Sequence, residues 1–69
     1  MPARRAADRR QAILEASSQL FEERGYYGTS LRMIARVANI SPSLLQKYFP
    51  TKESVIAAFV ERAIDELDA

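Results

Sequence analysis

Hydrophobic residues recur at helical spacing over the first third of the chain. An apolar stripe with a period near 3.6 residues, with polar side chains mostly on the other faces, predicts an amphipathic helix from about Ala7 to Arg24. Gly25 follows directly, where a left-handed residue commonly ends a helix. Residues 26–28 then form a connector, and one of its two tyrosines is expected to pack beneath the helix junction. The stripe consists of Ile13, Leu14, Ser17, Leu20 and Phe21.

A second apolar stripe predicts a short helix that begins near Ser30. Thr29 and Ser30 are both suitable capping residues, because their hydroxyls can accept hydrogen bonds from the first amides of the helix. A tight turn follows at Asn39, a residue type that tolerates left-handed backbone. Ile40 is expected to fill the gap between this helix and the next. The stripe consists of Leu31, Ile34, Ala35 and Ala38.

A third helix is predicted to begin after Ser41, with Pro42 at the favoured first helical position, and to end before Pro50. Leu45 and Phe49 are spaced to face inward, with Tyr48 partly beside them. The second and third helices are too short to persist alone in water. They therefore need a scaffold, and they are suited to presenting a surface.

The last apolar pattern predicts a fourth helix, capped by Thr51, that continues to the chain end. The far part of its apolar band, at Ile64 and Leu67, has little of this chain to pack against. We therefore expect it to dock on a segment that follows residue 69. The band consists of Val55, Ile56, Phe59, Val60, Ala63, Ile64 and Leu67.

These patterns predict an all-α fold, a small helical bundle in which a tight turn joins the second and third helices. Residues 7–69 form the bundle, and residues 1–6 are expected to be a disordered basic arm. Sixty-nine residues allow one domain at most. The chain has no Cys and no His, so disulfides and the usual zinc sites are excluded and helix packing must hold the core. No secretory signal or membrane-spanning run is present, and a cytoplasmic location is expected.

The net charge is only +1, but the charges are unevenly distributed. No acidic residue lies between Glu23 and Glu53, an interval with five basic residues, and four arginines lie in the first ten residues. Acidic residues predominate from Glu53 onward. A basic front and an acidic rear predict a face for a polyanion, and chance clustering is the alternative. The arm could lie along a nucleic-acid backbone or be a solvated tail.

The outward face of the third helix mixes small, amide, basic and apolar side chains. Such a mixture suits the edges of bases, since Gln can bond to adenine, Lys to guanine and apolar atoms to a thymine methyl group. An ordinary solvated face is the alternative. The start of the second helix favours an anion, and a phosphate contact would explain Lys52, a cation that opposes the dipole of the fourth helix. The outward residues are Pro42, Ser43, Leu44, Gln46 and Lys47.

Taken together, the residues resemble the DNA-binding domain of the TetR family of bacterial transcriptional repressors. The resemblance spans nearly the whole chain in one ungapped run, and the ensemble is specific although no single residue is. It is carried by Ile13, Ala16, Phe21, Gly25, Tyr26, Thr29, Ser30, Ile34, Ala35, Ala38, Ile40, Ser41, Leu45, Phe49, Lys52 and Glu53.

The resemblance implies a helical bundle of homeodomain-like type, in which the second and third helices form a helix-turn-helix. It also implies a homodimer that binds double-stranded DNA at palindromic operators, with the third helix in the major groove. It implies no cofactor. It also implies a larger C-terminal domain that binds a small-molecule effector and forms the dimer. That domain is absent from this chain, which is therefore expected to be an operator-binding head located at the nucleoid.

The resemblance also implies roles for individual residues. The family's phosphate contacts map to Thr29, Ser30, Tyr48 and Lys52, and its base-reading positions map to Arg32, Pro42, Ser43, Gln46 and Lys47. Four residues depart from the family pattern, and the first of them, Ser43, stands where the family often has Gly. Gln46 replaces the usual Tyr, Leu44 cannot donate a hydrogen bond to a phosphate, and Met33 replaces an acidic residue that would complete a capping box. These departures concern the operator sequence and not the fold.

The hypothesis favoured by the sequence is sequence-specific binding of double-stranded DNA by the head of a regulator, most simply a repressor. A helical protein-interaction module that does not bind DNA is the alternative, favoured by the apolar band of the fourth helix. An enzyme is disfavoured, because the chain has no His or Cys, no Ser beside a base and no Gly-rich phosphate loop.

Overall fold

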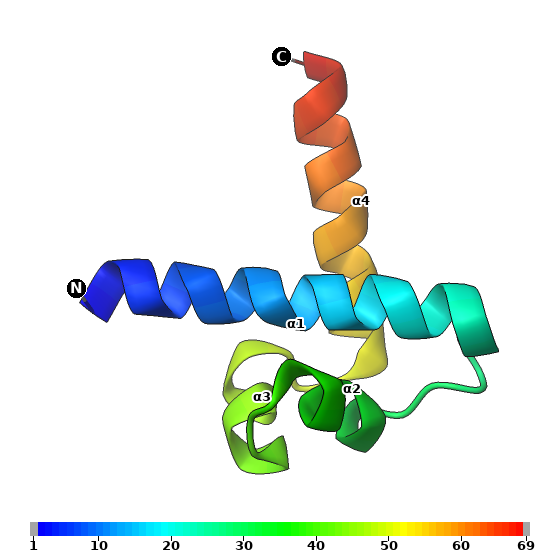
Figure 1. Cartoon of the computed structure of the whole chain (residues 1–69). Helices are drawn as coiled ribbons and strands as arrows, with labels where there is room; N and C mark the ends of the chain where they lie inside the picture. The colour runs from blue at the N-terminus through cyan, green and yellow to red at the C-terminus, as the bar shows by residue number, and fades with distance from the viewer. Residues whose placement is uncertain (1, 69) are drawn as a thin grey trace.

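The structure is a computed structural model that describes the backbone of residues 2–68 and the side chains of residues 5–67. The described chain forms four helices and no strands, as the apolar periodicities predict (Figure 1). The helices are α1 (Pro2–Arg24), α2 (Leu31–Ala38), α3 (Pro42–Tyr48) and α4 (Lys52–Asp68). The all-α prediction is therefore confirmed.

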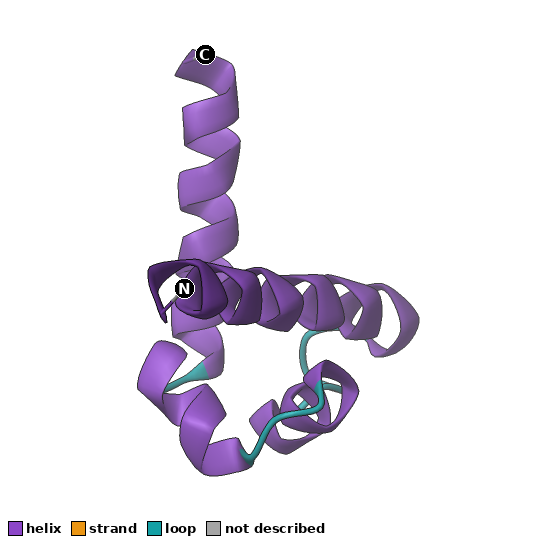
Figure 2. Ribbon diagram, turned by 60° about the vertical axis from the view of Figure 1, so that its left-hand side comes forward, coloured by secondary structure: helices purple, strands orange, loops and turns teal. Residues whose placement is uncertain are grey.

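The short helices α2 and α3 lie together on one side of the long helix α1 (Figures 1 and 2). Helix α4 starts on that side, crosses α1 and extends beyond it on the other side. Helix α1 packs against both α2 and α4, and α2 packs against α3. The long helices thus form the scaffold that the two short helices need.

The core lies where the four helices meet. Each helix contributes one apolar side chain with no exposed surface, namely Ile13, Ile34, Leu45 and Val55. Burying an aliphatic side chain of this size stabilises the fold by about 1.5–3 kcal/mol. Among the side chains that the structure describes, the buried apolar residues are Ile13, Leu14, Ala16, Leu20, Ile34, Ala35, Leu45, Phe49, Val55 and Ala58.

Helix α1 begins at Pro2 and not near Ala7 as predicted, so residues 2–6 continue the helix instead of forming a disordered arm. Met1 lies outside the described residues. The periodicity argument missed this segment because it has no apolar stripe. Its alanines and arginines nevertheless have high helix propensity, and proline is tolerated in a first turn.

The connector between α1 and α2 is held by main-chain geometry and by one buried hydroxyl. Gly25 has a φ of 78°, in the left-handed region that glycine adopts without strain at the end of a helix. Gly28 lies so close to α1 that an added Cβ would come within 2.3 Å of the Arg24 carbonyl oxygen. The Thr29 hydroxyl lies 2.9 Å from the Gly25 carbonyl oxygen and 3.3 Å from that of Leu20.

Side-chain caps define both short helices. The Ser30 hydroxyl accepts a hydrogen bond from the Met33 amide, and the Ser41 hydroxyl accepts one from the Leu44 amide, each at 3.1 Å. Asn39 ends α2 with φ 62° and ψ 45°, the left-handed conformation predicted for the turn. Ile40 is half-buried and packs against the core, as expected for the residue between the two helices.

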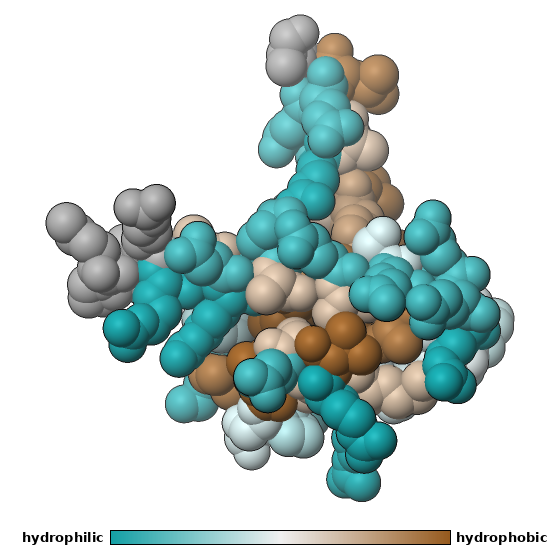
Figure 3. Space-filling model, viewed as in Figure 1, coloured by the Kyte–Doolittle hydropathy of each residue, from teal (hydrophilic) through white to brown (hydrophobic). Residues whose placement is uncertain are grey.

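Helix α4 is packed only in its first half. Thr51 and Ser54 cap its start, since each hydroxyl accepts a hydrogen bond from the main-chain amide of the other residue. Val55 and Ala58 are buried, whereas the apolar stripe farther along is exposed, with Leu67 85% exposed. Figure 3 shows apolar side chains running up one side of α4. The prediction that the far half lacks a packing partner within this chain is confirmed for the described residues.

Candidate nucleic-acid interface

One face of α3 is fully available to a partner. Pro42, Ser43, Gln46 and Lys47 are exposed, as expected, while Leu45 on the opposite face is buried. Ser43 and the pair Gln46 and Lys47 are separated by three and four residues, so these three side chains share one face. The surface therefore presents a hydroxyl, an amide and an ammonium group next to one another.

Leu44 was expected on the outward face, but the structure places it half-buried. The reason is the helical period, because Leu44 and Tyr48 are four residues apart and lie together on the flank of α3 between its outward and inward faces. Tyr48 is half-buried as well, as predicted. A flanking position leaves the Tyr48 hydroxyl beside the exposed face and not on it.

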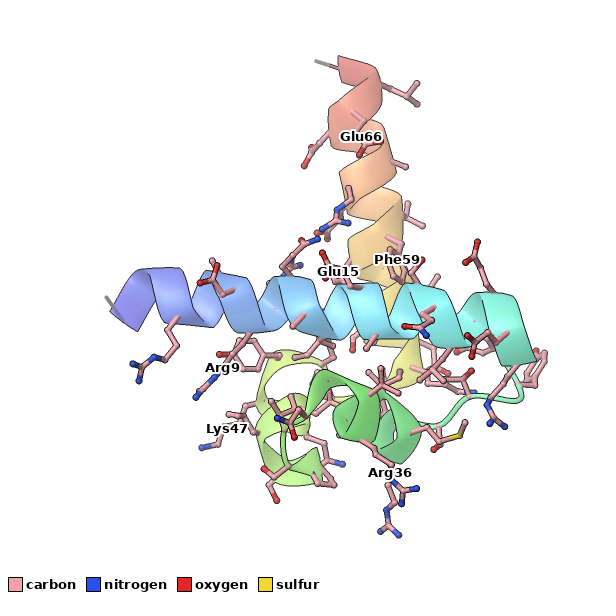
Figure 4. The ribbon with its side chains drawn as sticks, viewed as in Figure 1. Arg9, Glu15, Arg36, Lys47, Phe59 and Glu66 are labelled. Carbon is pink, nitrogen blue, oxygen red and sulfur yellow. The ribbon has the colours of Figure 1, made fainter. Side chains whose placement is uncertain are left out.

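Helix α2 adds two arginines to this surface. Arg32 and Arg36 are both exposed and border the same hollow between α2 and the start of α3, together with Ile40 and Pro42. Figure 4 shows Arg36 extending away from the rest of the fold. The sequence analysis assigned Arg32 to the site but not Arg36. The spacing of four residues between them was the signal that could have found it.

The start of α2 lies at the edge of this surface. Ser30 is exposed, and its hydroxyl oxygen already accepts a hydrogen bond from the Met33 amide. The hydroxyl proton can therefore still be donated to an anion. No acidic residue lies in the first turn of α2, so no carboxylate of that turn neutralises the positive end of the helix dipole.

Thr29 was predicted to contact a phosphate, and the structure corrects this expectation. Its residual exposure is 1%, its hydroxyl donates to the carbonyl oxygens of Leu20 and Gly25, and its amide donates to that of Tyr26. No donor of Thr29 is left for an external anion. Of the two adjacent hydroxyls, Thr29 holds the connector and Ser30 caps the helix.

Lys52 has a structural partner that the sequence did not reveal. Its side-chain nitrogen donates a 2.7 Å hydrogen bond to the carbonyl oxygen of Tyr26 and lies 4.2 Å from the centre of the Tyr26 ring. Desolvation and, to a smaller extent, the Glu53 carboxylate raise the pKa of Tyr26. The contact explains a cation at the start of α4, and two further donors of the ammonium group are left for an anion.

Lys52 and Ser30 border a common hollow at the edge of the interface, together with the 94% exposed ring of Tyr27 and with Glu53, the one carboxylate that lines it. The cations Arg32, Arg36 and Lys47 extend this surface across α2 and α3. The sequence between Glu23 and Glu53 contains no acidic residue, so no carboxylate of α2 or α3 offsets these charges. A surface of this kind attracts a polyanion.

The described residues offer little for other chemistry. Among the side chains of residues 5–67, no three acidic, His or Cys residues gather as a metal site would require. In the same part of the chain, no helix has the length and apolar character of a membrane span.

Comparison with known proteins identifies relatives of this chain. The model for bacterial regulatory proteins of the tetR family matches residues 13–59. The HTH-type transcriptional regulator HbdR of Aromatoleum sp. (strain CIB) is 36% identical over 58 residues, which cover 84% of this chain and 25% of HbdR. The HTH-type transcriptional regulator RutR of Escherichia coli (strain K12) is 36% identical over 62 residues, which cover 90% of this chain and 29% of RutR.

The HTH-type transcriptional repressor KstR of Mycolicibacterium smegmatis is 29% identical over 62 residues, which cover 90% of this chain and 30% of KstR. The chain therefore spans between 25% and 30% of the length of these curated relatives. No solved structure gives a significant match. The family match includes α2, α3 and the turn between them. This chain belongs to the tetR family of bacterial regulatory proteins and has the all-helical, helix-turn-helix DNA-binding domain of that family.

Proposed function

We propose that this chain is the operator-binding head of a transcriptional repressor and that α3 reads a specific sequence in the major groove of double-stranded DNA. The observation that supports this proposal most directly is the exposed face of Ser43, Gln46 and Lys47 on a helix held at both ends by the fold. It is supported further by the two relatives whose names describe them as transcriptional regulators and by one named as a repressor.

Base recognition follows from the chemistry of the exposed side chains. The Gln46 amide can bond to the two major-groove atoms of adenine, and the Lys47 ammonium to the acceptors of guanine. Ser43 can pair with either base type, and Pro42 offers apolar atoms to a thymine methyl group. Arg32 reaches from α2 toward the neighbouring base pair. Because Gln46 and Lys47 carry the most specific hydrogen-bonding groups, they are expected to determine most of the preferred sequence.

Phosphate contacts fix the orientation of the head on DNA without reading sequence. Ser30 supplies a hydroxyl and the amides at the start of α2, Lys52 supplies an ammonium, and Tyr48 supplies a phenol on the flank of α3. Thr29 is withdrawn from this set, because its donors are used inside the protein. Arg36 joins it as an exposed cation beside Arg32.

In a longer protein of this family, two such heads would form a homodimer and bind half-sites of a palindromic operator about one helical turn apart. A C-terminal domain would bind a small effector and control the distance between the heads. The exposed stripe at the end of α4 would pack against that domain, and the protein would act on DNA in the cytoplasm. The protein would use no cofactor and would not be an enzyme.

A helical interaction module that does not bind DNA is the second candidate, and the exposed apolar residues of α4 favour it. The most exposed of these residues are in the C-terminal half of α4, the half that extends beyond α1 and away from α2 and α3 (Figure 1). A protein contact on α4 and a DNA contact on α3 therefore use different surfaces. The two functions are therefore compatible, and substitutions on α3, not on α4, test DNA binding.

Selection from a pool of random duplexes tests the proposal. The chain should enrich one sequence, and the enriched duplex should bind at least tenfold more tightly than a random duplex at the same salt concentration. Gln46→Ala should reduce this ratio, whereas Gln19→Ala, which removes an exposed amide from α1, should leave it unchanged. Equal affinity for enriched and random duplexes would overturn the proposal.

A further inference from the structure

The first turns of α1 extend beyond the part of the helix that packs in the core. The helix begins at Pro2, whereas the first buried residue of the chain is Ile13 among the side chains described. Two arginines of this extension, Arg5 and Arg9, are exposed and separated by four residues, so they lie on the same face of the helix. Arg5 and Arg9 therefore have no role in the packing of the core.

The face that carries these arginines is the one that meets α2. Arg5, Arg9, Ala12 and Ala16 follow one another at spacings of four, three and four residues, so all four lie on one face of α1. Those two alanines border a hollow against the C-terminal end of α2. The arginines therefore lie on the side of α1 that faces the helix-turn-helix, beyond the end of the contact between α1 and α2.

A second contact places this part of α1 near the end of α3. The Arg10 guanidinium lies 5.4 Å from the centre of the Phe49 ring, immediately after α3. Arg10 is thereby engaged in the fold, while its neighbour Arg9 points elsewhere around the helix. Figure 4 shows Arg9 extending from α1 toward the side of α2 and α3, the side to which Lys47 also extends.

We propose that Arg5 and Arg9 form a second, sequence-independent DNA contact that binds phosphates flanking the base pairs read by α3. A guanidinium can donate two parallel hydrogen bonds to one phosphate. Two arginines one helical turn apart can contact two neighbouring phosphates of the same strand. The proposal rests on the proposed function, because the duplex bound is the one that α3 reads.

The charge and the length of α1 support this assignment over a solvated helix end. Both arginines lie on the side of α1 that carries the acid-free helices α2 and α3, and the acidic residues after Glu53 lie on α4. Asp8, which is next to Arg9 in the sequence, is the one carboxylate in this first part of α1, against the exposed arginines Arg5, Arg9 and Arg10. A rigid helix also holds its cations at fixed positions, so less entropy is lost on binding than with a disordered arm. The contact should increase affinity for any sequence and leave the preference among sequences unchanged.

The experiment measures how the affinity of the chain for DNA depends on salt concentration. Fluorescence anisotropy would follow binding to the enriched duplex and to a random duplex, both with long flanks, for the original chain and for the double variant Arg5→Gln and Arg9→Gln. Two phosphate contacts should lower the slope of log affinity against log salt by about 1.8. The single variant Arg9→Gln should lower it by about 0.9, by the same relation.

Arg62→Gln is the control, because it removes one positive charge from α4, where Arg62 donates a hydrogen bond to the side chain of Gln11 and does not lie on α2 or α3. It should leave the slope unchanged. The ratio of affinities for enriched and random duplexes should be the same for the double variant as for the original chain. A double variant whose slope equals that of the original chain would overturn the proposal.

The proposed function fails separately. If the original chain prefers no sequence but the double variant has the lower slope, base reading by α3 is refuted and the α1 contact is still supported. A chain that binds no duplex at all would refute both. Shortening the flanks of the duplex should lower the slope for the original chain and leave the slope of the double variant unchanged. If the slope of the original chain does not depend on flank length, the flanking contact is contradicted.

Discussion

The side-chain nitrogen of Lys52 donates a 2.7 Å hydrogen bond to the main-chain carbonyl oxygen of Tyr26, a residue 26 positions earlier in the chain. The same nitrogen lies over the Tyr26 ring. This contact ties the start of α4 to the connector that leads into α2. It therefore fixes the angle between the helix that extends beyond the core and the helix that begins the helix-turn-helix.

Replacing Lys52 by Met should therefore weaken the fold as well as DNA binding. Loss of a half-buried, charge-assisted hydrogen bond and of a cation–π contact should lower the free energy of unfolding by about 1–2 kcal/mol. Lys47→Met removes the same charge from an exposed position and should change stability by less than about 0.5 kcal/mol. Urea denaturation followed by circular dichroism measures both. Equal stability of the two variants would show that the Tyr26 contact does not stabilise the protein.

The burial of Thr29 leads to a prediction that separates structure from binding. Thr29→Val keeps the shape of the side chain but leaves the carbonyl oxygens of Leu20 and Gly25 without their donor, at a cost of about 1–3 kcal/mol. Thr29→Ser retains the hydroxyl and should cost less. At temperatures below its unfolding transition, Thr29→Val should bind DNA as tightly as the original chain does. A large loss of affinity in the fully folded variant would show that Thr29 contacts a phosphate after all.

The turn between α2 and α3 depends on the left-handed backbone of Asn39. Asn39→Ala places a Cβ-bearing residue without a compensating side-chain amide at a φ of 62°. This should destabilise the protein by about 1 kcal/mol, while Asn39→Gly should be tolerated. Thermal unfolding of the two variants provides the measurement. A glycine variant less stable than the alanine variant would mean that the left-handed conformation is not the limiting feature of the turn.

The exposed stripe of α4 should contribute nothing to the stability of this chain. Ile64→Gln and Leu67→Gln remove apolar groups that are already 52% and 85% exposed, and should change the free energy of unfolding by less than about 0.5 kcal/mol. Ile13→Val, a small change at a fully buried site, should cost about 0.5–1.5 kcal/mol. If the α4 variants cost as much as Ile13→Val, the stripe would have a partner in this chain.

Local signals predicted most of the fold. The caps at Ser30 and Ser41 and the turn at Asn39 were all visible in the sequence, because capping and left-handed turns depend on a few neighbouring residues. The start of α1 was missed, because residues 2–6 have helix propensity but no apolar period. The half-burial of Leu44 followed from its position on the flank of a helix only seven residues long.

The site was harder to predict where it depends on contacts between distant segments. Thr29 and Ser30 both suit a cap, and only the path of the connector determines which hydroxyl turns inward. The partner of Lys52 lies in another part of the chain, so the sequence indicated that this cation needed a reason but not which one. The exposure of Gln46 and Lys47 was predictable, because it follows from helical spacing alone.

We propose above all that Gln46 reads one base pair of the bound duplex. Its most direct test is to measure the affinities of the original chain and of Gln46→Ala for the enriched duplex and for every single base-pair substitution within one half-site. The original chain should bind the enriched base pair more tightly than each substituted one, by about 1–3 kcal/mol at each contacted position. Gln46→Ala should lose that discrimination at one position and keep it at the others. If Gln46→Ala lost affinity uniformly for all duplexes, or kept its discrimination at every position, base reading by Gln46 would be contradicted.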